Sequence, residues 1–146
     1  MQKFSRDSFN VNEAINELMH ESGVIVIKNA YNLNDIKEAR EIVNHFADTE
    51  EQKETHFNAE AEASKQIKLQ QRIWNLFGKG DIFSKLISDD IIFSLMSKLL
   101  GSEFFCGSYC GSRLLPGSLG QELHIDYPYW DFYNSETFPM GLNSSF

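Results

Sequence analysis

Apolar and polar residues recur with a helical period over two stretches near the N-terminus. In the first stretch one stripe contains Val11, Ala14, Ile15, Leu18 and Met19. Asn10 or Asn12 can cap this helix, and Gly23 can end it. The second stretch opens with Asn32 as its cap and Asp35 for a capping box. Its buried side contains Ile36, Ala39, Val43 and Phe46. The pattern therefore predicts two amphipathic helices, each with one face in a core.

Two further helices are predicted in the middle of the chain, over residues 81–87 and 89–100. Their apolar residues also follow the helical period, and Gly101 provides a stop. The apolar positions are Ile82, Phe83, Leu86, Ile87, Ile92, Leu95, Met96 and Leu99. These spacings are typical of helices that pack against a core.

Three stretches favour strands. Residues 24–27 form a β-branched run that is too short for a helix and apolar on both faces, as in a buried strand. Residues 68–77 contain Ile73 and Trp74 as apolar anchors and predict a second strand. Residues 104–115 form a long extended segment that ends at a Pro-Gly turn. Small residues on both of its faces indicate a strand that lines a cavity or is closely approached by other backbone.

Composition limits the kinds of partner. The 146 residues are 42% hydrophobic and 13% aromatic, which is ample for one folded domain with its own core. A net charge of -8 argues against a nucleic-acid or anionic-membrane partner, because a polyanion would be repelled. No apolar run suits a signal peptide or reaches the roughly 20 residues of a membrane span. We therefore expect a cytoplasmic protein with small-molecule partners.

Cys106 and Cys110 lie four residues apart in the extended segment. At roughly 3.3 Å per residue they are about 13 Å apart, which is beyond the reach of a disulfide. They are predicted to be free thiols in a reducing compartment. A zinc site would need a second ligand pair at matching spacing, and the sequence contains none.

The most informative motif is His124-Ile125-Asp126. On a strand, residues two apart point to the same face, so the imidazole and the carboxylate can bind one metal ion. Such a pair fits the 2-His-1-carboxylate triad of non-haem Fe(II) oxygenases, which leaves coordination positions open for reagents. By spacing alone, a surface strand with two polar residues is the simpler interpretation.

The run from Gly111 to Tyr129 closely resembles the metal-binding stretch of the phytanoyl-CoA dioxygenase family, which uses Fe(II) and 2-oxoglutarate. Residues 22–30, 71–76 and the helix before Gly101 extend this resemblance with less specific matches. It implies an α+β fold with N-terminal helices packed on an incomplete double-stranded β-helix, a jelly-roll of cupin-like shape. It also implies hydroxylation of a small organic molecule.

The resemblance assigns roles to individual residues. His124 and Asp126 are the expected catalytic and metal-binding residues, and Asp126 fills the place that related halogenases open for chloride. Arg72 and Arg113 are candidates for binding the carboxylate of 2-oxoglutarate by a bidentate pair, with a structural salt bridge as the alternative. Three aromatic residues are expected to shape the substrate pocket or, alternatively, to pack at a sheet edge. They are Tyr127, Tyr129 and Trp130.

Family members have a distal His and an Arg beyond the Asp, whereas residues 127–146 contain no His, Arg or Lys. We therefore expect a single, truncated domain over residues 1–146 that is inactive in this form. Two alternatives remain open. One is a noncatalytic cupin-like binding module, and the other is an interaction protein that completes its sheet by self-association through an exposed edge.

Overall fold

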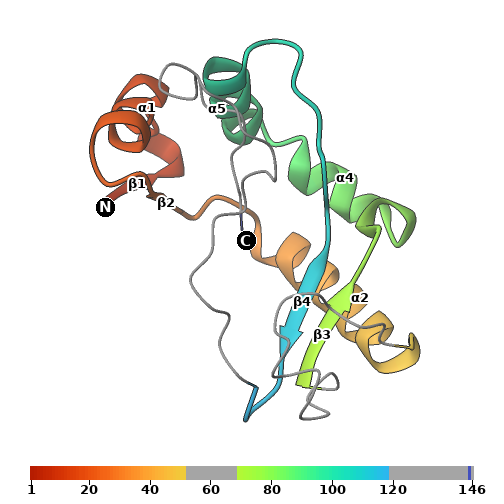
Figure 1. Cartoon of the computed structure of the whole chain (residues 1–146). Coiled ribbons are helices and arrows are strands. Elements are labelled where there is room, and N and C mark those ends of the chain that lie inside the picture. Colours follow the sequence, from red (N-terminus) through yellow and green to blue (C-terminus); the bar gives the residue numbers. More distant parts are fainter. Residues whose placement is uncertain (52–68, 119–144, 146) are drawn as a thin grey trace, which may run out of the picture. The chain divides into compact units, whose positions relative to one another are not determined.

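The computed structural model of the protein describes residues 1–51, 69–118 and 145, and these form a mixed α+β structure, as predicted (Figure 1). The chain divides into two compact units. The described residues of the first are 1–33, 85–105 and 145, and those of the second are 34–51, 69–84 and 106–118. No helix in these ranges combines the length and the apolar character that a membrane span requires.

In the first unit, strand β1 (Gln2–Ser5) pairs in parallel with β2 (Ile25–Lys28). Helix α1 (Val11–His20) begins where predicted, because the Asn10 side chain accepts hydrogen bonds from the backbone N–H groups of Asn12 and Glu13. The core of this unit contains Phe4, Ala14 and Leu95. The two helices that pack together around it are α1 and α5 (Asp90–Leu100).

The prediction that residues 24–27 form a strand buried on both faces is wrong. The strand begins at Ile25, and only Ile25 and Ile27 pack against the core, whereas Val24 and Val26 are exposed. Burial on both faces requires a layer on each side of a parallel sheet. Among the described residues, β2 has β1 beside it and the core on one face only.

Helices α4 (Asp81–Ile87) and α5 confirm the two helices predicted in the middle of the chain. The Asp89 side chain caps α5 by accepting a hydrogen bond of 3.0 Å from the Ile91 N–H, and Gly101 ends the helix at a φ of 87°. Asp89 also forms a 2.7 Å ion pair with Arg6, which follows β1 in the short 3-10 helix η1 (Arg6–Ser8). The pKa of the Tyr31 hydroxyl is raised, mainly because the side chain is partly buried and also because Asp89 is negatively charged.

The second unit is a two-stranded ribbon covered by a helix. Strand β3 (Gln70–Ile73) pairs antiparallel with β4 (Gly111–Leu114), so that Gln71 lies opposite Arg113 and Ile73 opposite Gly111. Helix α2 (Leu33–Thr49) lies against one face, where the Gln71 side chain donates to the Ala47 carbonyl at 3.2 Å. The buried apolar residues of the second unit are Ala39, Ala47, Ile73, Leu76, Ile82 and Phe83.

The ribbon is shorter than the sequence predicted. Strand β3 ends at Ile73 because Asn75 adopts the left-handed conformation, with a φ of 55°, before the 3-10 helix η3 (Leu76–Gly78). The extended segment predicted over residues 104–115 is a strand only from Gly111 to Leu114. Before it, the Tyr109 carbonyl accepts a hydrogen bond from the Leu76 N–H in η3, and not from a neighbouring strand.

Candidate functional site

The residues predicted to bind metal and substrate lie outside the described part of the chain. They are His124, Asp126, Tyr127, Tyr129 and Trp130. The structure does describe the strand that precedes them. Strand β4 is followed by the predicted Pro116-Gly117 turn, in which Gly117 has a φ of 90° and the Ser118 N–H donates to the Leu115 carbonyl at 3.1 Å. The two arginines predicted to bind 2-oxoglutarate lie on this ribbon and can be compared directly.

Arg113 faces α2. Its Nη2 lies 2.5 Å from an Asp48 carboxylate oxygen, and its Nε donates to the Gln71 side chain at 2.5 Å. Its Nη1 lies 3.4 Å from the side-chain oxygen of Asn44. The hydrogen bond from Arg113 lowers the pKa of Asp48, and the positive charge of Arg113 lowers it further. Arg113 therefore forms the structural salt bridge that the sequence offered as the alternative.

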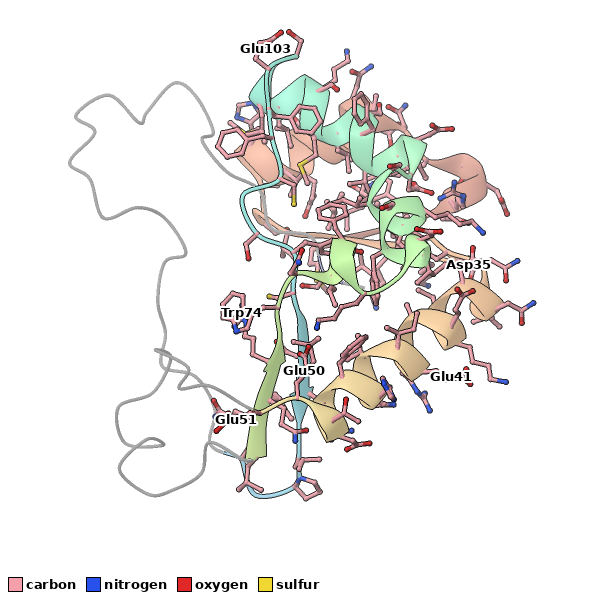
Figure 2. The ribbon with its side chains drawn as sticks, turned by 90° about the vertical axis from the view of Figure 1, so that its right-hand side faces the viewer. Asp35, Glu41, Glu50, Glu51, Trp74 and Glu103 are labelled. Atoms are coloured by element: carbon pink, nitrogen blue, oxygen red, sulfur yellow. The ribbon has the colours of Figure 1, made fainter. Side chains whose placement is uncertain are left out.

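Arg72 points to the other face of the ribbon. Its guanidinium carbon lies 5.1 Å from the centroid of the Trp74 ring, which is a cation–π contact. Its Nε donates to the Cys110 Sγ at 3.2 Å. Figure 2 shows Trp74 projecting from the end of β3 on the side away from α2. Arg72 and Trp74 share this face because they are two residues apart.

The two faces of the ribbon differ in exposure. On the α2 side Ile73 is fully buried, and a side-chain carbon on Gly111 would lie 3.0 Å from Val43. On the opposite side Trp74 is 47% exposed and Leu114 is 66% exposed. We call this side the open face. It contains the exposed Trp74, Ser112 and Leu114, the half-buried Arg72 and Cys110, and Gln70, which is buried.

Arg72 is the charged residue that β3 and β4 contribute to the open face. Arg72 lies opposite Ser112 in the register, and neither β3 nor β4 contains Asp or Glu. A guanidinium beside an exposed indole and a serine hydroxyl can bind an anion that also has apolar surface. The pairing of Arg72 with Trp74 follows from strand alternation, whereas the sequence pattern indicated Trp74 only as an apolar anchor. The hydrogen bond from Arg72 to Cys110 joins residues 38 apart, and no local sequence pattern indicates it.

The described residues contain no group of three or more His, Cys, Asp or Glu placed to bind a metal ion. His45 is exposed on α2, and His20 lies in the last turn of α1. Cys106 and Cys110 are free thiols, as predicted. The donor set of His124 and Asp126 nevertheless fits Fe(II), because imidazole nitrogen and carboxylate oxygen are the ligand types of the facial triad. This pair would be two of the three protein ligands that the triad requires.

Comparison of the chain with protein-family models, with curated proteins and with solved structures finds no match.

Proposed function

We propose that the protein is an Fe(II)- and 2-oxoglutarate-dependent dioxygenase of the phytanoyl-CoA dioxygenase type that hydroxylates a small organic molecule. The observation that carries this proposal is the His124-Ile125-Asp126 motif, a few residues beyond β4 and its Pro116-Gly117 turn. In the overall reaction the substrate C–H bond, 2-oxoglutarate and O2 are converted to C–OH, succinate and CO2. Hydroxylation is favoured over halogenation because the carboxylate of Asp126 would fill the coordination place that related halogenases open for chloride.

His124 and Asp126 would hold the metal in this proposal. Iron, together with 2-oxoglutarate and O2, supplies the oxidising chemistry, while the protein orients the ligands and excludes water. Tyr127, Tyr129 and Trp130 are proposed to shape the substrate pocket. Residues 127–146 contain no histidine, so this stretch does not supply the third protein ligand.

The proposed fold is a jelly-roll of cupin-like shape in which β3 and β4 are two of the strands. Its support is the arrangement of the second unit, where α2 covers one face of an antiparallel pair and the polar residues Gln70, Arg72 and Ser112 occupy the other. We propose that α2 lies outside the jelly-roll and that the open face lines its interior. A cytoplasmic location also belongs to the proposal, in keeping with the two free thiols.

Of the two arginines considered for 2-oxoglutarate, Arg72 is the better candidate for an anion. Arg113 already has an acidic partner in Asp48 and polar partners in Gln71 and Asn44. Replacing that carboxylate by a ligand would remove one of the contacts between α2 and the ribbon. Arg72 lies on the opposite face of the ribbon, where it contacts Trp74 and Cys110.

A second candidate function is a noncatalytic cupin-like binding or interaction module. The exposed Trp74 and Leu114 of the open face favour it, because an apolar surface next to a cation suits ligand binding without any metal. The two functions differ in their dependence on metal and in turnover.

Manganese(II) tests the metal site, because it accepts the same nitrogen and oxygen ligands as Fe(II), is stable in air and broadens nearby NMR signals. We expect the broadening to centre on residues 124–126 and to be lost in His124→Ala and Asp126→Ala. The control His45→Ala removes an exposed imidazole from α2 and should keep it. Broadening that neither site variant changes would rule out this metal site.

Succinate release separates the two functions. The chain is incubated with Fe(II), 2-oxoglutarate and O2, and succinate is compared with that from His124→Ala. Release above the level of the variant supports the dioxygenase. Metal binding at His124 without succinate release agrees with the expected inactivity of residues 1–146, whereas a chain that binds no metal at His124 favours the noncatalytic module.

A further inference from the structure

We propose that the outer face of the β1·β2 sheet binds an acidic amphipathic helix of a partner protein. The outer face is the side of this sheet that points away from the core of the first unit. It contains Lys3, Ser5, Val24, Val26 and Lys28. This interaction goes beyond the proposed function and does not depend on it, because the outer face includes no proposed metal ligand.

The alternation of side chains along the two strands defines the outer face. Phe4 of β1 lies in the core of the first unit, and Ile25 and Ile27 of β2 pack against it. The residues next to them in the sequence therefore point to the opposite side of the sheet. The parallel register places Lys3 opposite Val26. A lysine and a valine are thus neighbours on the outer face.

Two β-branched residues of the outer face are exposed to solvent. Val24 is 47% exposed and Val26 is 37% exposed. Parallel strands in proteins are generally covered on both faces, and a β-branched run such as residues 24–27 is typical of strands covered in this way. Among the described residues, the core covers only the inner face of β2. The sequence of this strand and its exposure agree if a further layer covers the outer face in a complex.

Lysines determine the charge of the outer face. Lys3 and Lys28 are both exposed, and neither β1 nor β2 contains Asp or Glu. Within the described ranges neither lysine forms an ion pair. Because complementary charges select partners and like charges reject them, a partner should have carboxylates beside its apolar residues.

An amphipathic helix has the pattern that this face requires. On the inner side the sheet contacts α1, and helices on both faces are the usual arrangement around parallel strands. The apolar stripe of a partner helix would contact the two valines, while acidic side chains along its flanks would reach the two lysines. The exposed apolar area is small, so we expect a weak, transient complex.

Two other occupants fit the outer face less well. A second copy of this chain, packed face to face, would bring the lysines of both copies together, and like charges repel. An anionic membrane would attract the two lysines but would repel the whole chain, which has a net charge of -8. A short acidic helix has far less negative charge than a membrane surface and can contact the lysines alone.

The test uses two synthetic peptides of about 16 residues, each cross-linked between two turns so that it stays helical. Both have leucines on one face. The flanking residues are glutamates in one peptide and lysines in the other. Binding to the full chain is followed by the methyl signals of Val24 and Val26 in ¹³C NMR spectra. These signals are assigned by their absence from Val24→Ile and Val26→Ile.

We expect the glutamate peptide to bind about tenfold more tightly than the lysine peptide, since two exposed ion pairs and the relief of repulsion are together worth about that factor. The double variant Lys3→Glu with Lys28→Glu should reverse this preference. The matched control, Lys37→Glu with Arg40→Glu, makes the same change of charge on exposed residues of α2 and should keep it. Added salt should reduce the preference.

Equal binding of the two peptides to the wild-type chain would overturn the proposal, and that comparison needs no variant. Unchanged valine signals with about 1 mM glutamate peptide would overturn it too. Shifts of these signals that grow with protein concentration alone would replace the helix by a second copy of the chain. Shifts caused by phosphatidylserine vesicles, and not by the peptide, would replace it by a membrane. Failure of the metal site at His124 would leave each of these outcomes unchanged.

Discussion

Arg113 on β4 and Asp48 on α2 form an ion pair with 2.5 Å between Nη2 and the carboxylate oxygen. The pair joins the last turn of α2 to a strand 65 residues later in the chain. The Arg113 side chain is mostly buried, whereas Asp48 is largely exposed to solvent. The contact therefore helps to orient α2 on the ribbon. It adds little to the free energy of unfolding, since exposed ion pairs contribute little.

This ion pair should make stability depend on pH. The folded-state pKa of Asp48 lies below its value in the unfolded chain, about 3.9. The stabilisation is thus complete above that value and is lost as pH falls through the folded pKa. We expect Asp48→Asn to lower the urea midpoint at pH 7 and to converge with the wild-type chain in acid. Glu41→Gln, on an exposed side of α2, should change little at either pH. A difference that persists in strong acid would contradict this origin.

Gly111 should tolerate no branched side chain. A Cβ at this position would lie 3.0 Å from Cγ2 and 3.2 Å from Cγ1 of Val43, whose side chain is stiff about χ1. We expect Gly111→Val to lower the free energy of unfolding by about 1–3 kcal/mol through overpacking. The double variant with Val43→Ala should recover part of the loss, measured by urea denaturation. Ser112→Val introduces the same side chain on the open face and should not show this cost.

Asp89 has two roles that substitutions can separate. It caps α5 through the Ile91 N–H and pairs with Arg6. Asp89→Ala loses both, and the cap alone is worth about 1 kcal/mol. Asp89→Asn keeps a capping oxygen and loses only the charge, so we expect a clearly smaller decrease in thermal midpoint. Equal decreases would show that the ion pair, and not the cap, is the main contribution.

The two free thiols should react at different rates. Cys106 is exposed, whereas Cys110 is partly buried beside Arg72. Because reagent access limits thiol modification in a folded protein, Ellman's reagent should react in two phases, with Cys106 the faster. Cys106→Ser should remove the fast phase and Cys110→Ser the slow one. A single phase for both thiols would show that Cys110 is more accessible than the structure indicates.

Local signals predicted the helices well. The start of α1 at Val11 and the end of α5 at Leu100 each depend on a cap within a few residues, Asn10 and Gly101. Strand β1 was not predicted, because Gln2–Ser5 shows no run of apolar residues and its pairing with β2 depends on a segment more than 20 residues away. The exposure of Val26 was missed for a related reason. Residue type does not tell how many layers cover a sheet.

The candidate site was predictable only in part. The spacing of Arg72 and Trp74 indicates a shared face. The sequence alone did not show that Arg113 forms an ion pair with Asp48, or that Arg72 donates a hydrogen bond to Cys110. Both contacts join segments distant in the chain, and they depend on how β3 pairs with β4. The metal-binding role of His124 and Asp126 stays a prediction, because those residues lie outside the described part of the structure.

The pairing of Gln71 with Arg113 and of Arg72 with Ser112 puts the two arginines on opposite sides of a ribbon only four residues long. A slip of β4 by a single residue would turn Arg113 outward and bring a neutral side chain under α2, because side chains alternate at every step. The close fit of Gly111 against Val43 opposes such a slip. A glycine without functional groups of its own thereby helps to decide which of two chemically identical cations lies on the α2 side of the ribbon and which on the open face.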